Sequence, residues 1–226
     1  MITLADIHRQ FRTDEVETTA LRAIDLNIEA GEFVAIMGPS GCGKSTLLNI
    51  MGLIDRPTSG RYLFKGQEVM DLREAELARL RRDNIGFVFQ SFNLIDELTI
   101  AENVELGLVY RRWAGKERKA RVEAAMDRVG VAHRARHYPH QLSGGQQQRA
   151  AIARAIVGEP SIILADEPTG NLDTENGEQV MDILKTLNGE GATIVMVTHS
   201  PAHADIAKRV VNMLDGQIIV SARRAA

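Results

Sequence analysis

The sequence lacks several features that would point to a particular cellular setting. Its 226 residues include one cysteine, Cys42, so no disulfide can form within the chain and a reducing compartment is expected. The longest apolar runs, such as 33–37 and 162–165, fall far short of the roughly 18 residues that a membrane-spanning helix needs. The N-terminus has no basic segment followed by an apolar one, so we expect no signal peptide. If the protein acts at a membrane, another component must anchor it.

An excess of positive charge is also missing. Lys and Arg number 27 against 30 Asp and Glu, which gives a formal net charge of −3. A surface that binds nucleic acid phosphates usually needs clustered positive charge, so no nucleic acid partner is expected. The pairs Arg111-Arg112 and Arg223-Arg224 are better explained as solvated surface than as a binding patch.

Hydrophobic patterning predicts an α/β fold. Apolar runs indicate buried strands over 32–37, 161–165 and 192–197, and helices with apolar stripes follow the first two. The alternation of strands and helices indicates a largely parallel sheet that is covered on both faces. Strands are also expected at 2–11 and 21–28, joined by a polar loop that contains Thr13, Asp14 and Glu15, and a tight turn at Asp215-Gly216 should join two short terminal strands.

The middle of the chain has a different character. A short strand is expected over 85–89, and an amphipathic helix over 116–129. Thr99 with Glu102, and Ser143 with Gln146, are predicted capping boxes at helix starts. We therefore predict one domain over 1–226, in which a helical subdomain at 95–158 is inserted into an α/β core formed by 1–94 and 159–226.

A glycine-rich loop between a predicted strand and a predicted helix is the strongest local signal. Residues 38–45, GPSGCGKS, fit the phosphate-binding pattern G-x-x-x-x-G-K-[ST]. Glycines let backbone N–H groups converge on a phosphate, and the helix start adds partial positive charge. Lys44 should reach the β- and γ-phosphates, and the Ser45 hydroxyl should bind Mg²⁺. The predicted nucleotide-binding residues of this loop are Gly38, Pro39, Ser40, Gly41, Cys42, Gly43, Lys44, Ser45 and Thr46.

Two adjacent carboxylates, Asp166 and Glu167, directly follow the apolar run at 162–165. At the carboxyl end of a strand they can point toward the phosphate loop. Asp166 suits Mg²⁺, directly or through water. Glu167 suits a general base that takes a proton from attacking water. Such a pair alone is usually a helix cap or surface charge, and the phosphate loop favours the catalytic interpretation.

The sequence Leu-Ser-Gly-Gly-Gln at 142–146 precedes a predicted helix. Two glycines at a capped helix start form a second anion site, which comprises Ser143, Gly144, Gly145 and Gln146. Ser-Gly-Gly is often only a flexible linker, but linkers do not normally run straight into a helix. Two phosphate sites in different subdomains can lie too far apart to share one nucleotide within a monomer. Head-to-tail pairing of two copies would solve this.

Taken together, these motifs resemble the nucleotide-binding domains of ABC transporters. The phosphate loop, Gln90, the LSGGQ sequence, the Asp-Glu pair, Asn171-Leu172-Asp173 and His199 follow in the order of that family, and the resemblance covers about 2–220. It implies a P-loop NTPase core with a mostly parallel sheet, an N-terminal antiparallel β subdomain and an inserted α-helical subdomain. It also implies ATP and Mg²⁺ as cofactors, hydrolysis of ATP to ADP and phosphate, and an ATP-dependent homodimer.

The resemblance also implies roles for single residues. Gln90 would contact Mg²⁺ and the attacking water, and would relay contact with a membrane subunit. Ser143 and Gly145 would touch the γ-phosphate held by the opposite copy, and Asp173 would cross the dimer interface. His199 would contact the γ-phosphate and help to hold the general base.

Phe11 is the match to the aromatic residue that stacks on adenine in the family, where tyrosine is commoner. Phenylalanine keeps the ring and loses the hydroxyl. The alternative is an ordinary core phenylalanine.

The residue sequences of several motifs resemble those of the MacB/LolD branch, which drives lipoprotein release or macrolide and peptide export. The relevant segments are 37–41, 55–60, 86–94 and 165–173. This implies a separate integral membrane permease as partner and a peripheral location on the cytoplasmic face of the inner membrane. The alternative is a soluble ABC-type ATPase that acts on nucleic acid or as a regulator. An ATPase that acts on nucleic acid would need a coiled-coil or zinc insert, for which this chain has no room. A regulator would usually have lost Glu167 or His199.

Overall fold

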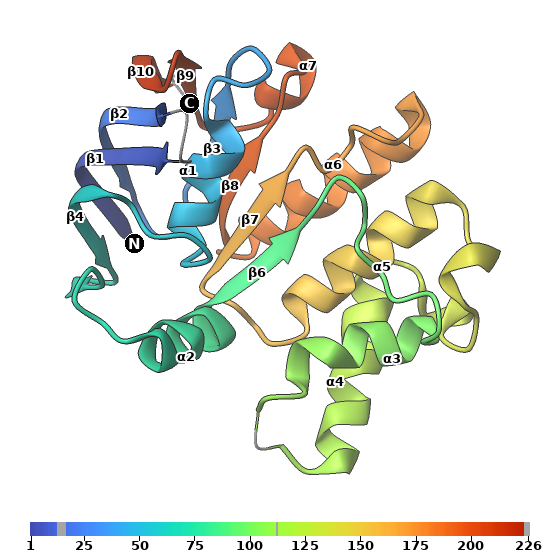
Figure 1. Ribbon diagram of the computed structural model, residues 1–226. Coiled ribbons are helices and arrows are strands. Elements are labelled where there is room, and N and C mark those ends of the chain that lie inside the picture. Colours follow the sequence, from blue (N-terminus) through green and yellow to red (C-terminus); the bar gives the residue numbers. More distant parts are fainter. Residues whose placement is uncertain (13–16, 112, 224–226) are drawn as a thin grey trace. The chain divides into compact units, whose positions relative to one another are not determined.

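The computed structural model describes residues 1–12, 17–111 and 113–223 (Figure 1). The polar loop predicted at 13–15 lies outside these residues, as do Arg112 and Arg224 of the two predicted surface pairs. The chain forms two compact units: the first comprises 1–81 and 193–226, and the second comprises 82–192.

The first unit contains two groups of strands. Strands β1, β2, β4 and β5 pair antiparallel in the order β2-β1-β4-β5. In the other group, β3 pairs parallel with β8 on one side and with β9 on the other, and β10 pairs antiparallel with β9. Helix α1 contacts both β2 and β8. The elements are β1 (Ile2–Arg12), β2 (Glu17–Ile28), β3 (Phe33–Met37), α1 (Lys44–Met51), β4 (Ser59–Phe64), β5 (Gln67–Glu68), β8 (Thr193–Val197), α7 (Pro201–Ala204), β9 (Arg209–Leu214) and β10 (Gln217–Arg223).

Strands β3 and β8 form the centre of this unit. Every residue of β8 is buried, and so is every residue of β3 except the last. A parallel strand that is covered on both faces needs apolar side chains on both, which explains the unbroken apolar runs in the sequence. Buried residues in β1 and β2 come at intervals, because one face of that sheet is exposed. The predicted strands of this unit are confirmed.

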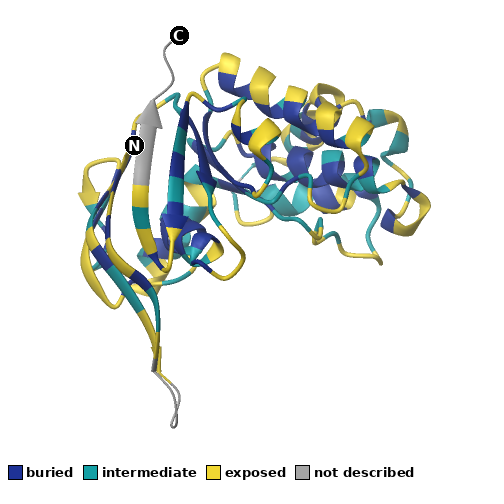
Figure 2. Cartoon of the chain, turned by 90° about the horizontal axis from the view of Figure 1, so that it is seen from above, coloured by how far each residue is buried: buried dark blue, intermediate teal, exposed yellow. Residues whose placement is uncertain are grey.

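The second unit is mostly helical. Its strands β6 and β7 pair parallel, and α5 contacts β6, α3, α4 and α6 (Figure 1). Two of its helices, at 115–128 and 174–189, bury one face and expose the other (Figure 2), whereas no residue of the helix at 144–156 is exposed. The elements are β6 (Ile85–Val88), α3 (Ile100–Glu105), α4 (Gly115–Arg128), α5 (Gly144–Ile156), β7 (Ile162–Asp166) and α6 (Thr174–Gly189), with short 3₁₀ helices at Leu106–Leu108, Ala132–Arg134 and Pro139–Gln141. Helix α2 (Glu74–Asn84) runs in sequence from the first unit into the second.

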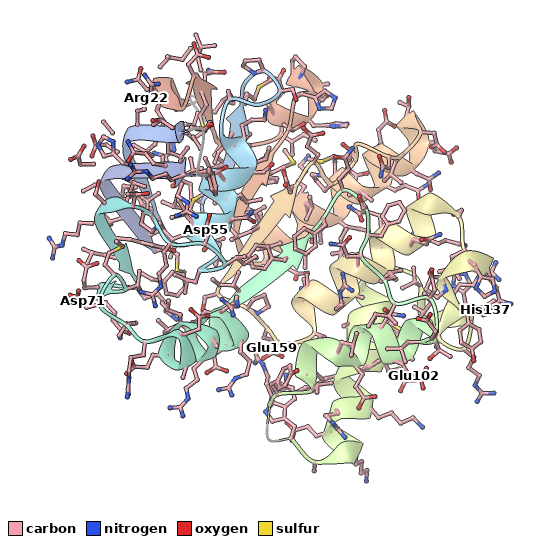
Figure 3. The ribbon with its side chains drawn as sticks, viewed as in Figure 1. Arg22, Asp55, Asp71, Glu102, His137 and Glu159 are labelled. Carbon is pink, nitrogen blue, oxygen red and sulfur yellow. The ribbon has the colours of Figure 1, made fainter. Side chains whose placement is uncertain are left out.

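Both predicted capping boxes are present. The Thr99 hydroxyl accepts the Glu102 N–H at 3.3 Å, and the Glu102 carboxylate, labelled in Figure 3, accepts the Thr99 N–H at 2.8 Å. Ser143 and Gln146 make the same two bonds, at 3.3 and 3.2 Å. Each box satisfies two N–H groups at a helix start, so it fixes where α3 and α5 begin.

The unit boundaries differ from those predicted for the helical subdomain. Strands β6 and β7, which we assigned to the core, pair with each other within the second unit, and β6 packs on α5. The bounds 95–158 of the helical subdomain stay a prediction. None of the helices that the structure describes is both long and apolar enough to cross a bilayer.

Some elements were not predicted. Helix α2 buries only Leu77, so it has no apolar stripe, and β4 begins with three exposed residues. Helical spacing predicts an apolar stripe of Val180, Ile183, Leu184 and Leu187 in α6. The structure leaves Ile183 half-buried and buries Met181 beside Val180 and Leu184.

Candidate functional site

The phosphate loop links β3 to α1 in the first unit. Gly41 and Gly43 have φ angles of 79° and 99°, in the left-handed region that glycine adopts readily. A Cβ on Gly43 would lie 2.5 Å from the Ala20 carbonyl oxygen, so the loop has no room for a side chain there. Gly43 is the N-cap of α1 and makes no side-chain cap, so the first-turn N–H groups of α1 are not covered by a capping side chain. This geometry suits an anion.

Lys44 is folded into its own loop. The residue is 6% exposed, and its ammonium donates to the carbonyl oxygens of Gly38 at 2.9 Å and Pro39 at 2.8 Å. The positive charge is therefore held inside the loop, where it complements a phosphate. Cys42 is buried, with its sulfur 4.0 Å from the same ammonium, so its side chain faces the protein interior.

His199 and the phosphate loop leave the same edge of the first unit's parallel strands. In the pairing of β3 with β8, Ile36 lies opposite Val197, and Thr198 donates its N–H to the Ile36 carbonyl at 3.1 Å. Because the strands are parallel, their carboxyl ends meet at one edge. His199 is exposed there, two residues beyond the end of β8.

Phe11 lies near the end of β1 with 42% of its surface exposed. The guanidinium of Arg9 lies 4.4 Å from the centre of its ring. The alternative of a core phenylalanine is therefore wrong, because a core side chain would be buried. The ring offers an exposed aromatic surface.

In the second unit, Gln90 and the carboxylate pair leave one edge of the β6–β7 pair. Val88 lies opposite Ala165, Asp166 ends β7, and Glu167 follows with φ 45°. A non-glycine residue in this conformation is strained, and such strain is common at functional sites.

Asn171 fixes Gln90 in place. The Gln90 amide donates to the Asn171 side-chain oxygen at 3.1 Å, and the Asn171 amide donates back to the Gln90 carbonyl at 3.1 Å. A Cβ on Gly170 would lie 2.7 Å from the Gln90 amide nitrogen, so glycine is what allows this approach. From the sequence, Asn171 was known only as part of a motif; its pairing with Gln90 was not predicted.

The second anion site lies at the start of α5, where Ser143 is the N-cap residue. A Cβ on Gly145 would overlap the side chain of Asn176. Asn176 in turn donates its backbone N–H to Asp173, the N-cap of α6, at 2.9 Å, and its side-chain amide at 3.0 Å. These hydrogen bonds, the backbone one first, lower the pKa of Asp173. Asn176 was missed in the sequence, although it stands three residues after an N-cap aspartate.

A phosphate loop between a parallel strand and a helix, with an Asp-Glu pair at the end of another parallel strand, defines a P-loop nucleoside triphosphatase. The model of the ABC transporter family matches residues 21–170. The chain therefore belongs to the ABC transporter family. It is an ATP-binding subunit of that family and hydrolyses ATP, as the sequence motifs predicted.

Relatives that are named as ATP-binding or ATP-binding/permease proteins match nearly the whole chain. It is 50% identical to the uncharacterized ABC transporter ATP-binding protein YknY of Bacillus subtilis, over 97% of this chain and 95% of YknY. It is 52% identical to the macrolide export ATP-binding/permease protein MacB of Azoarcus, over 97% of this chain but 33% of that protein. This chain thus spans about a third of the length of MacB. The similarity to the MacB type is confirmed.

Among solved structures, the chain matches the dimeric ATP-binding cassette MJ0796 in a post-hydrolysis state bound to ADP and Pi. The two are 46% identical, the match covers 100% of both chains, and the TM-score is 0.92. This confirms the predicted α/β P-loop NTPase fold.

Proposed function

We propose that two copies of this chain close head to tail around ATP, and that hydrolysis there powers a separate membrane permease. The observation that carries the proposal is the presence of two anion sites, the phosphate loop of the first unit and the start of α5 in the second. In the proposed dimer, each nucleotide lies between the phosphate loop of one copy and the α5 start of the other. The dimeric state of the MJ0796 structure supports this arrangement.

Binding uses groups from both copies. The loop N–H groups and Lys44 hold the phosphates of ATP, and Phe11 stacks on the adenine ring. The segment from Ser143 to Gln146 binds the γ-phosphate from the opposite copy, where the helix start favours negative charge. Asp173 reaches across the interface toward the opposite phosphate loop.

Hydrolysis needs a water molecule in line with the γ-phosphorus. Glu167 accepts a proton from that water as its oxygen bonds to phosphorus, and the bond from phosphorus to the ADP oxygen breaks, which leaves ADP and phosphate. Gln90 and His199 orient the water and the γ-phosphate. The pairing of Gln90 with Asn171 holds it in one position before the reaction.

The donor atoms fit Mg²⁺. The hydroxyl of Ser45, the side-chain oxygen of Gln90 and the carboxylate of Asp166 are hard oxygen donors, as Mg²⁺ prefers. Among the residues that the structure describes, no three His, Cys, Asp or Glu side chains gather into a metal-binding group. Mg²⁺ in nucleotide sites is usually bound by few protein ligands together with nucleotide phosphates. When bound, Mg²⁺ would neutralise charge on the β- and γ-phosphates.

The permease is proposed to dock beside the segment that follows Gln90. Phe92 and Leu94 are half-buried and Ile95 is 43% exposed, which is an unusual set of apolar side chains for a loop. A cavity of about 360 Å³ lies beside it, lined by residues that include Phe87, Phe89, Asn93, Arg111 and Arg154. Its lining combines aromatic rings with arginine side chains, so it offers both apolar and polar contacts to a partner. The MacB relative is named a macrolide export ATP-binding/permease protein, which supports a permease partner. We further propose a peripheral position on the cytoplasmic face of the inner membrane and export of lipoprotein, peptide or macrolide-type substrates.

The variant Glu167→Gln tests the proposed function. It keeps the shape of the side chain and removes the proton acceptor, so hydrolysis should fall by ~10²–10⁴. ATP should still bind, and the variant should elute as a dimer in size-exclusion chromatography with ATP and as a monomer without it. Hydrolysis at the wild-type rate would refute the role of Glu167.

The docking site is tested separately. Leu94→Asp and Ile95→Asp should weaken co-purification with the permease while ATP affinity stays unchanged. A matched charge at another half-buried apolar residue of the same unit, Ile183→Asp on α6, serves as the control. If the loop variants co-purify as well as the control, the permease docks elsewhere.

A further inference from the structure

Helix α5 directs two polar side chains, Gln148 and Arg154, at the backbone of residues 89–93. Gln148 is fully buried, and its amide donates to the carbonyl oxygens of Phe89 at 3.3 Å and Pro168 at 2.6 Å. Phe89 directly precedes Gln90, and Pro168 directly follows Glu167. The Gln148 side chain thus bonds to the backbone next to both Gln90 and Glu167. Its own oxygen accepts no hydrogen bond from the described part of the chain.

Arg154 holds the other end of the same segment. Its guanidinium donates to the carbonyl oxygens of Phe92, at 2.8 Å, and of Asn93. Burial lowers the pKa of Arg154, but an arginine stays charged in proteins, so both bonds come from a cation and are of the strong kind.

The backbone that Arg154 holds is strained. Phe92 and Asn93 have φ angles of 61° and 51°, a conformation that side chains other than glycine rarely adopt. Two such residues in succession persist only where their surroundings hold them. The two bonds from Arg154 do so, and they close a turn directly after Gln90 and Ser91.

We propose that Gln148 and Arg154 are positioning residues that fasten the 89–93 backbone to α5, so that Gln90 and the Ser143 end of α5 move as one body. The proposal rests on the proposed roles of Gln90 and Glu167. Gln148 fixes the distance between the backbones beside these two residues, and Arg154 prevents the turn after Gln90 from relaxing. A permease that pushes on the 92–95 segment would then move the second anion site with it.

The test measures local opening and kinetics in the full chain. Arg154→Met and Gln148→Met remove the hydrogen bonds and keep much of the side-chain volume. Amide hydrogen exchange at 90–95 should become on the order of tenfold faster or more in both. The kcat for ATP should fall roughly ten- to hundredfold, because the water-positioning group is misplaced, while KM for ATP stays within about twofold.

Two further variants make the result specific. Arg149→Met is the matched control, because Arg149 lies on the same helix and its guanidinium bonds to Gln179 instead. It should leave exchange at 90–95 unchanged. Arg154→Lys keeps the charge but has a single donor nitrogen, so its exchange rate at 90–95 and its kcat should lie between those of the wild type and Arg154→Met. It also replaces Arg154→Met in the test if that variant does not fold.

Either of two results would overturn the proposal: unchanged exchange at 90–95 in the Arg154 and Gln148 variants, or a change no larger than in Arg149→Met. A different experiment tests the proposed function: if that function is wrong, Glu167→Gln hydrolyses ATP at the wild-type rate. The hydrogen exchange results at 90–95 do not depend on that outcome.

Discussion

The two units of this protein bind and act through different kinds of groups. In the first unit, the phosphate loop works through its backbone: glycines with positive φ, a helix start without a side-chain cap, and a lysine held by loop carbonyls. In the second, the functional groups are side chains that other side chains hold, such as Gln90 by Asn171 and Asp173 by Asn176.

This difference predicts how each unit responds to substitution. A backbone site fails when an added side chain changes the shape of the loop, so substitutions in the phosphate loop of the first unit should lower ATP affinity. A side-chain site can lose its chemical group while its shape persists, so substitutions that displace Gln90 in the second unit should lower kcat. The predictions below test that division.

The largest effect is expected at Gly43. In Gly43→Ala, the new Cβ would meet the Ala20 carbonyl oxygen at 2.5 Å in a backbone conformation that alanine disfavours, so ATP binding should be lost. Gly41→Ala is the matched control, because Gly41 also has a positive φ but nothing lies within 4 Å of its Cβ. It should weaken binding by only about five- to thirtyfold, from strain of roughly 1–2 kcal/mol. Binding is measured with a fluorescent ATP analogue. Equal losses in both variants would contradict the importance of the close approach.

An intermediate effect is expected at Gly170. In Gly170→Ala, the added Cβ would lie 2.7 Å from the Gln90 amide nitrogen, and the flexible end of Gln90 would move away. We expect kcat to fall several-fold to roughly a hundredfold, with ATP affinity unchanged. Gly189→Ala, at the end of α6 with nothing within 4 Å, should keep wild-type kinetics. A change in affinity rather than in kcat would break the division between the two units.

The smallest effect is expected at Phe11. Aromatic stacking contributes about 0.5–1.5 kcal/mol, so Phe11→Ala should raise KM for ATP by a few-fold to about tenfold. Phe11→Tyr keeps the ring and should match the wild type. Because Phe11 is 42% exposed, neither variant should lower the melting temperature as a core substitution would. An unchanged KM in Phe11→Ala would show that another group holds the adenine.

The sequence predicted the elements and residues that local patterns encode. Apolar runs predicted β3, β7 and β8 because fully buried parallel strands need them, and capping residues predicted where α3 and α5 begin. Helix α2 was not predicted, since a helix that buries only Leu77 shows no periodic stripe. Several proposed site residues lie in short contiguous motifs, such as the phosphate loop at 38–45 and LSGGQ at 142–146, which a sequence displays directly.

Contacts between distant polar residues could not be predicted in this way. Gln148 bonds to a carbonyl 59 positions earlier in the chain, and no local pattern marks a glutamine for that contact. The strained turn at Phe92 and Asn93 was missed as well, because the usual sign of positive φ is glycine. The long-range bonds that hold such a turn are visible only in the structure.

The central claim is that each ATP lies between two copies, and a mixing experiment tests it most directly. Lys44→Ala disables the phosphate loop and keeps the α5 start, and Ser143→Arg does the reverse, so each variant alone should be inactive. In an equal mixture, half of the randomly formed dimers combine one copy of each. Every mixed dimer has one intact site, so the mixture should recover about a quarter of the wild-type ATPase activity. No recovery, with both variants folded and able to dimerise, would contradict the account.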